Sequence, residues 1–425
     1  MRAPIPGLTG LRFFAAAGVV LSHAIPTIIK SPDPPLWLQV LSQTAAEGMP
    51  LFFVLSGFVI FYNYSGSVSR PVGLYNFFIA RFSRLYPLYF VGVSYDLLMK
   101  FAYSQVPETF AALPYYATMT QSWFYVPIGQ HALIYQYGLV PSVAWSISTE
   151  WFFYLAFPFI CRAILLLRSL RATLLAILGL VVAAYVGFVM LNLNNAVIES
   201  LAVRAFGPIA ANQQDSFFRW LMYFSPYARI VEFTLGCLCA ALHMRLAPIA
   251  VSSAERRFGL GLTIAALAGI ATMHYVMFGL QSGALWHRIL IGLHLNFAFA
   301  PLLATLIFCC ARYRNAIVRV FAHPLLVTFG EASYSLYLLH LLPVFAYRWE
   351  APPVTSPRVA VGGVLQLILT LMSAIGLSLV SHALIEVPAQ RLLRRLMIRK
   401  RTEPAAAAPA LAQADAQGAA PTAAG

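Results

Sequence analysis

Two ionisable residues, Arg12 and His23, lie in the first apolar stretch of the chain. Charged groups inside such a stretch are functional candidates because burying them is costly. They are eleven residues apart, about 16 Å along a helix, and so lie on nearly the same face. Pro26 cannot donate a hydrogen bond to the carbonyl of Ser22, so we expect the backbone beside His23 to be locally open. His23 can act as a base or nucleophile, or can simply bond to a neighbouring helix.

A carboxylate, Glu150, stands at the start of a later apolar stretch and follows Ser146 and Ser148. We expect Glu150 to face His23 from a similar depth, to orient the imidazole and to raise its basicity. The two serines are candidates for substrate binding. Capping of the following helix is the alternative for this segment.

Arg81 and Arg84 are three residues apart in a segment between two apolar stretches. That spacing places both on one face of a helical turn. Forked guanidinium groups suit phosphate binding. Setting the membrane topology and contacting lipid headgroups are the alternative roles for this pair.

Other polar residues within apolar stretches have less specific patterns. Tyr337 and His340 could line a substrate path or bond between helices. Arg229 and Glu232 are three residues apart and should form an ion pair. Glu386, followed by Pro388, should end the last apolar stretch.

No metal ion is expected in this protein, and the cysteines offer no site for one. Cys237 and Cys239 are too closely spaced for a zinc pair and lack evident companion ligands. The remaining three, Cys161, Cys309 and Cys310, also lie in or beside apolar stretches. All five are best explained as small apolar residues of a membrane core.

The composition indicates what must position these side chains. The chain has 425 residues, of which 60% are hydrophobic and only 10% charged. Soluble domains have about a quarter charged residues. The apolar stretches recur along the chain, each near the ~20 residues that cross a bilayer. No cleavable signal peptide is evident, and the first stretch should be retained.

The sequence therefore predicts an all-α, polytopic membrane protein with about ten transmembrane helices. A further apolar piece, 110–126, is interrupted by Pro114 and should be interfacial or re-entrant. The ten expected spans are 8–29, 47–64, 85–101, 149–167, 173–191, 230–243, 258–278, 289–310, 333–347 and 359–385.

Basic residues alternate in density between successive loops. The denser set includes the segments with Arg81 and Arg84, with Arg256 and Arg257, and the stretch after the last span. The positive-inside rule then places both termini in the cytoplasm. The net charge of +14 is spread over separate short loops, which argues against a nucleic-acid partner.

Two regions follow from this pattern. Residues 1–390 form the membrane domain, and residues 391–425 form a basic and then Ala/Pro-rich cytoplasmic tail. The composition of 402–425 predicts disorder.

Six segments in this order resemble the acyltransferase-3 family of membrane acyltransferases, and the resemblance runs from residue 8 to residue 388. The segments are RFFAAAGVVLSH, GMPLFFVLSGFVI, ARFSRLYPLYF, AWSISTEWFFYLAFP, RIVEFTLG and SYSLYLLH. The resemblance implies a ten-helix enzyme of a bacterial inner membrane that O-acylates surface polysaccharide, lipopolysaccharide or related glycosides.

The resemblance also implies roles for individual residues. It makes Arg12 and His23 central, and it matches Arg81, Arg84 and Glu150 to family positions. Where many members have an acidic residue, this chain has Pro50, so any charge role there is absent.

Together, residues and resemblance predict transfer from acetyl-CoA or another acyl-CoA to a carbohydrate hydroxyl. Arg81 and Arg84, with Arg12, would bind the donor, and His23 would act as general base or as covalent acyl carrier. A transporter with an intramembrane His/Arg/Glu pathway is the alternative, although paired broken spans in two matching halves are not evident.

Overall fold

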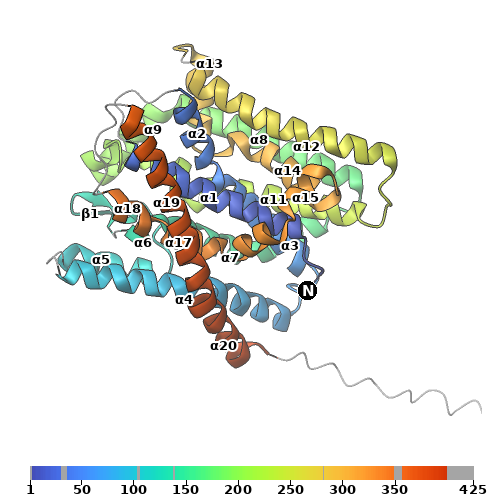
Figure 1. The fold of residues 1–425 in the computed structure, drawn as a ribbon, viewed down its shortest axis with the longest axis horizontal. Coiled ribbons are helices and arrows are strands. Elements are labelled where there is room, and N and C mark those ends of the chain that lie inside the picture. The colour runs from blue at the N-terminus through green and yellow to red at the C-terminus, as the bar shows by residue number, and fades with distance from the viewer. Residues whose placement is uncertain are drawn as a thin grey trace, which may run out of the picture.

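The computed structural model describes residues 2–29, 36–102, 106–136, 139–280, 282–348 and 357–399. The predicted disordered tail, 402–425, lies outside them. The described residues confirm the all-α prediction (Figure 1). Their one sheet is the antiparallel pair β1 (Pro127–Ile128) and β2 (His131–Ala132).

The α-helices of the described residues are α1 (Pro6–Ile28), α2 (Leu36–Ala46), α3 (Gly48–Tyr64), α4 (Pro71–Ala102), α5 (Val106–Ala117), α6 (Leu139–Val143), α7 (Trp145–Leu165), α8 (Leu170–Leu193), α9 (Asn195–Phe206), α10 (Phe217–Arg219), α11 (Pro226–Leu246), α12 (Ser253–His274), α13 (Leu285–His294), α14 (Ala300–Arg312), α15 (Ala316–Phe321), α16 (Pro324–Glu331), α17 (Ser333–Leu339), α18 (Leu341–Arg348), α19 (Pro357–Ser381) and α20 (Val387–Met397). Short 3₁₀ or π turns are η1 (Leu133–Tyr135), η2 (Pro208–Ala211), η3 (Trp220–Phe224), η4 (Tyr275–Gly279), η5 (Phe297–Phe299) and η6 (His382–Glu386).

Six helices of the described chain are long and apolar enough to cross a membrane, and a bent pair makes a seventh if it counts as one span. The six are Pro6–Ile28, Trp37–Tyr64, Leu170–Leu193, Phe217–Leu246, Ser253–Gly279 and Gly362–Met397. The number ten is therefore not established by length and apolar character.

The outer helices have apolar surfaces that the protein itself does not cover. In α8 only 6% of the most apolar window is buried, and its exposed residues include Leu175 and Val186. In α19, Met372 is 64% exposed. Such extended apolar surface on long helices is expected of contact with lipid rather than water.

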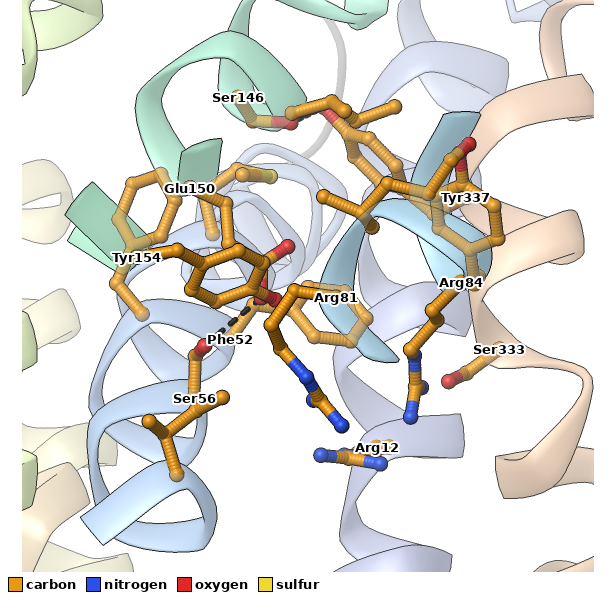
Figure 2. A pocket seen from close by; sticks show the side chains of 16 residues that line it. Arg12, Phe52, Ser56, Arg81, Arg84, Ser146, Glu150, Tyr154, Ser333 and Tyr337 are labelled. Atoms are coloured by element: carbon orange, nitrogen blue, oxygen red, sulfur yellow. Dashed lines mark hydrogen bonds between the residues drawn. The ribbon is translucent and has the colours of Figure 1, made fainter. Parts of the chain in front are cut away.

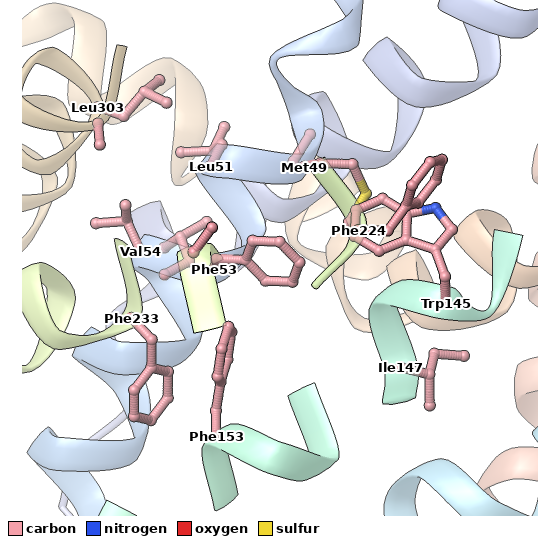
Figure 3. Packing of buried hydrophobic residues seen from close by; sticks show 14 of the residues in the cluster. Met49, Leu51, Phe53, Val54, Trp145, Ile147, Phe153, Phe224, Phe233 and Leu303 are labelled. Atoms are coloured by element: carbon pink, nitrogen blue, oxygen red, sulfur yellow. The ribbon is translucent and has the colours of Figure 1, made fainter. Parts of the chain in front are cut away.

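The interior is held by close helix contacts at glycines and by aromatic packing. A Cβ on Gly57 of α3 would lie 2.0 Å from the carbonyl oxygen of Phe233, so only glycine allows α3 and α11 to approach this closely. Phe153 of α7 packs against Phe53 at 5.2 Å and against Phe233 at 5.0 Å between ring centroids. Figure 3 shows these rings between the three helices. Gly57 therefore has a structural role in this contact.

Two expected spans are interrupted. The span 289–310 is wrong as a straight helix, because α13 and α14 meet at 93° near Asn296, whose side-chain amide donates to the carbonyl of Met222 at 2.6 Å. The span 333–347 divides into α17 and α18 at His340. Pro343 in the first turn of α18 has no N–H for the carbonyl of Leu339, which explains the break.

The predicted end of the last span at Glu386 is also wrong. The helix passes through the π turn η6, in which the N–H of Val387 bonds to the carbonyl of His382, and continues into α20, so Pro388 does not end it. The beginning of the predicted tail, up to Met397, is therefore helical, and α20 packs against α4. In the piece 110–126, α5 ends at Ala117 and a non-helical segment follows.

Candidate active site

A cavity lies between five helices. The lining residues come from α1, α3, α4, α7 and α17 (Figure 2). They are Arg12, Met49, Phe52, Phe53, Ser56, Ile60, Arg81, Arg84, Leu85, Ser146, Ile147, Glu150, Tyr154, Ser333, Tyr334 and Tyr337.

Three guanidinium groups converge on this cavity. Figure 2 shows the ends of Arg12, Arg81 and Arg84 directed toward the same space. The charge of Arg12 interacts with those of Arg81 and Arg84. Like charges repel, so an arrangement of this kind needs anionic partners to be stable.

Arg81 is held in place by aromatic neighbours. Its side chain is buried, its Nη2 donates to the hydroxyl of Tyr64 at 2.8 Å, and its guanidinium lies 5.0 Å from the centre of that ring. Its buried Nε has no hydrogen-bond partner. The arginine is thus oriented with donor capacity left over for a ligand.

Glu150 supplies the one carboxylate of the lining. Its Oε1 accepts hydrogen bonds from Ser56 at 2.8 Å and from the hydroxyl of Tyr154 at 2.5 Å. Three guanidinium groups less one carboxylate leave the cavity with a charge of +2. The cavity is therefore suited to a polyanionic ligand such as a phosphate ester.

Tyr337 forms the opposite wall of the cavity. Its hydroxyl accepts from Ser146 at 2.7 Å and donates to the carbonyl of Val143 at 2.5 Å. These bonds join α17 to the end of α6 and to the first turn of α7. Ser146 thus lines the cavity, and its contact with substrate stays a prediction.

Beyond Tyr337 lies a pair of histidines that does not line the cavity. His340 Nδ1 is 2.6 Å from the carbonyl oxygen of Tyr337, and His340 Nε2 is 3.2 Å from His23 Nδ1. His340 is buried, whereas His23 is exposed at the protein surface. Tyr337 connects the cavity wall to this pair.

The bonding of the pair determines where the protons lie. A carbonyl only accepts, so His340 Nδ1 carries its proton and Nε2 of the neutral ring is an acceptor. His23 Nδ1 faces that acceptor and also the carbonyl oxygen of Val19 at 2.9 Å. The proton of neutral His23 is therefore on Nδ1, and its Nε2 keeps the lone pair needed by a base or nucleophile.

Comparison with known proteins identifies the family. A family model described as an acyltransferase domain matches residues 5–383.

The chain belongs to the acyltransferase-3 family. It is also similar to the acyltransferase MdmB of Streptomyces mycarofaciens, with 27% identity over 404 residues that cover 92% of this chain and 93% of the relative. No solved structure matches. The protein is thus an integral membrane acyltransferase, and family membership favours transfer chemistry over transport.

In this acyltransferase the predicted pairing of Glu150 with His23 is wrong. Glu150 bonds to Ser56 and Tyr154 beside the arginines, and His23 has His340 as its side-chain partner. His23 is on α1 and Glu150 is on α7. A similar predicted depth in the membrane therefore did not bring the two side chains into contact.

Ser148 and the arginine pair also differ from expectation. The hydroxyl of Ser148 accepts from the backbone N–H and the hydroxyl of Ser122, and Ser148 is absent from the cavity lining. This position argues for a structural role in place of the predicted substrate contact. Arg81 and Arg84 are inside α4, not in a loop, although their shared face was predicted correctly.

Two site residues of the acyltransferase were not predicted, namely Tyr64 and Tyr154. Tyr154 follows Glu150 by one helical turn, which is a signal available in the sequence. Ser56 also lines the cavity. Its bond to Glu150 spans 94 residues and has no local signature. The predicted ion pair of Arg229 and Glu232 is confirmed at 3.0 Å with both side chains fully buried.

Proposed function

We propose that this acyltransferase moves an acyl group, acetyl by expectation, from acyl-CoA to a hydroxyl of a surface polysaccharide, lipopolysaccharide or related glycan. The observation that carries the proposal is the convergence of Arg12, Arg81 and Arg84 on one cavity with a single carboxylate. Coenzyme A carries a diphosphate and a 3′-phosphate, and guanidinium groups bind such esters through paired hydrogen bonds.

A second hollow adjoins the cavity and offers a route for the donor. It is lined by Arg70 and Arg394 among others. Tyr64 lines this hollow and accepts the hydrogen bond from Arg81 of the cavity. Buried Arg394 Nε has no hydrogen-bond partner. The nucleotide part of coenzyme A would lie in the hollow while its pantetheine arm enters the cavity.

The proposed membrane frame has ten spans and both termini in the cytoplasm of a bacterial inner membrane. The arginine cavity then opens toward cytoplasmic acyl-CoA, and His23 lies toward the outer side, where glycans are found. Reporter fusions at Ser69 and Ser252 should give cytoplasmic signals, and a fusion at Gln213 should give an external one. Opposite signals would reverse the donor and acceptor sides.

The chemistry centres on Nε2 of His23. As a general base, this nitrogen takes the proton of the acceptor hydroxyl, whose oxygen attacks the thioester carbonyl. The carbon–sulfur bond breaks, and the coenzyme A thiolate leaves and receives the proton from the imidazolium. In the covalent route Nε2 attacks the carbonyl first, the carbon–sulfur bond breaks, and coenzyme A leaves as the thiolate. The acceptor hydroxyl then attacks the acyl carbon, the carbon–nitrogen bond breaks to free the imidazole, and the hydroxyl proton passes to the thiolate.

Purified enzyme in lipid nanodiscs tests this proposal. Radiolabelled acetyl-CoA should yield free coenzyme A thiol and labelled glycan in equal amounts when membrane glycan is supplied. Quenching the reaction before acceptor is added distinguishes the general-base route from the covalent route, because only the covalent route leaves labelled acetyl on the protein. Absence of thiol release with every glycan and acyl chain length tried would refute coenzyme A as donor.

A further inference from the structure

A cluster of three ligating side chains lies apart from the acyl-transfer site. Among the described residues, Glu47, His274 and His294 place one potential ligand atom each within 4.8 Å of one another. Glu47 precedes α3, His274 ends α12 and His294 ends α13. Figure 1 shows α13 beside one end of α12 and near α2. The bend between α13 and α14 brings His294 to this position.

The hydrogen bond of His274 indicates that its ring is neutral, so it does not balance the charge of the Glu47 carboxylate. His274 Nδ1 lies 2.9 Å from the carbonyl oxygen of Ile270, so Nδ1 carries the proton and Nε2 of the neutral ring has a lone pair. That Nε2 is 3.9 Å from Glu47 Oε1 and has no hydrogen-bond partner. A lone pair facing a carboxylate is repulsive unless a cation lies between them.

The other atoms of the cluster are also unsatisfied. Nε2 of His294 lies 2.9 Å from Glu47 Oε1 in a geometry that makes no hydrogen bond, and buried Glu47 Oε2 has no partner. His274 is fully buried and Glu47 is 6% exposed. Buried carboxylates are normally paired, hydrogen-bonded or bound to metal.

Aromatic neighbours fix both imidazole rings. His274 stacks on Phe299 with 4.1 Å between ring centroids, and His294 meets Phe278 edge to face at 4.9 Å. The side chain of His294 is 17% exposed, which leaves an approach for a small ion. The ligand atoms are thus held by packing.

We propose that Glu47, His274 and His294 bind one Zn²⁺ ion. Two imidazole nitrogens and a carboxylate are a frequent zinc ligand set with a fourth position open. Ligand atoms on a tetrahedral zinc ion are about 3.4 Å apart when each bond is about 2.1 Å long. The observed separations of 2.9 and 3.9 Å from Glu47 Oε1 lie on either side of that value. The bond from His274 Nδ1 to a carbonyl is the outer contact that zinc-bound histidines usually make.

The zinc content of the intact purified protein tests this site. Wild type, purified in detergent after expression with added zinc, should hold one zinc per chain by mass spectrometry. Replacement by Co²⁺ should give the intense visible bands of a tetrahedral site. Glu47→Gln and His294→Gln should each weaken Zn²⁺ affinity at least tens-fold and remove the bands. His131→Gln, which changes a histidine that is 57% exposed outside the cluster, should leave both readouts unchanged.

Folding of each variant is checked by size exclusion and by thermal unfolding without metal. Added Zn²⁺ should raise the unfolding temperature of wild type and of His131→Gln only. Sub-stoichiometric zinc in wild type, with no Co²⁺ bands, would overturn the proposal and indicate an imidazolium–carboxylate pair. Equal zinc binding by wild type and the two cluster variants would overturn it in favour of adventitious surface binding.

Discussion

The two ends of α1 carry opposite kinds of chemistry. Near its start, Arg12 joins Arg81, Arg84 and Glu150 around a cavity with a charge of +2. Eleven residues later, His23 joins His340 in a pair that is neutral and in which every proton has an identifiable position. One region is built to attract an anion, and the other to present a lone pair.

Under the proposed function, this difference divides the reaction between the two regions. An anion site gains from excess positive charge, whereas a base loses basicity when positive charge is close. The anion site and His23 are separated along α1 by about 16 Å. This distance limits how far the positive charge of the arginines lowers the basicity of His23. Tyr337, which touches the cavity and bonds to His340, is the contact through which the two regions meet.

The largest effect expected is at the histidine end. His23→Ala should lower the turnover of acyl transfer about 10²-fold or more, because a positioned base or nucleophile is lost. Donor affinity should stay within about two-fold if the two regions are separate. Turnover and coenzyme A binding are measured on the same purified sample. Ser22→Ala is the matched control, and a variant of His23 that keeps a tenth of the turnover would remove His23 from the chemistry.

The next effect is at the arginine end. Arg81→Gln combined with Arg84→Gln should raise the apparent constant for acyl-CoA at least tens-fold, since each charge-assisted contact is worth about 1.5–3 kcal/mol. Turnover at saturating donor should change little. Lys at both positions should restore part of the affinity, because the charge is kept and the fork is lost.

Steady-state kinetics and direct coenzyme A binding measure this change. Arg257→Gln, at an exposed position of α12, is the matched control for loss of surface charge. If the correctly folded double variant bound coenzyme A with unchanged affinity, the arginine pair would only set the membrane topology. The proposed separation of donor binding from the histidine chemistry would then be wrong.

A smaller effect is expected for the positioning residue of the histidine pair. His340→Ala should lower turnover about ten-fold, because the acceptor that orients His23 Nδ1 is lost, and one hydrogen bond is worth about 0.5–1.5 kcal/mol. His340→Gln should recover part of that turnover because its amide oxygen can accept from His23. Equal loss in both variants, with altered thermal unfolding, would indicate a purely structural role.

The smallest effect is expected at Glu150, which tests whether this residue acts in the arginine region or in the histidine region. Glu150→Gln removes the one negative charge of the cavity, so donor binding should tighten about two- to five-fold, equivalent to about 0.5–1 kcal/mol. Turnover should stay nearly constant, since Glu150 has no bond to His23. A large fall in turnover with unchanged donor binding would restore the orienting role that the sequence suggested.

The sequence by itself determined the features that depend on neighbouring residues. Helical periodicity placed Arg81 beside Arg84 and paired Arg229 with Glu232, and the apolar stretches established the membrane class. Each of these follows from helix geometry or from the transfer of side chains out of water, which are local properties. The resemblance to known acyltransferases then added the reaction.

Only the tertiary structure decided which distant residues meet. His23 and His340 are 317 positions apart, and Ser56 reaches Glu150 across 94. The cluster of Glu47, His274 and His294 likewise forms only where three helix ends and the bend at Asn296 come together. Such contacts depend on the crossing and rotation of packed helices, which result from many weak interactions at once. The spacing of residues along the chain does not encode these interactions, so the sequence identified Arg12, Arg81, Arg84, Glu150 and His23 as candidates but not which side chains they contact.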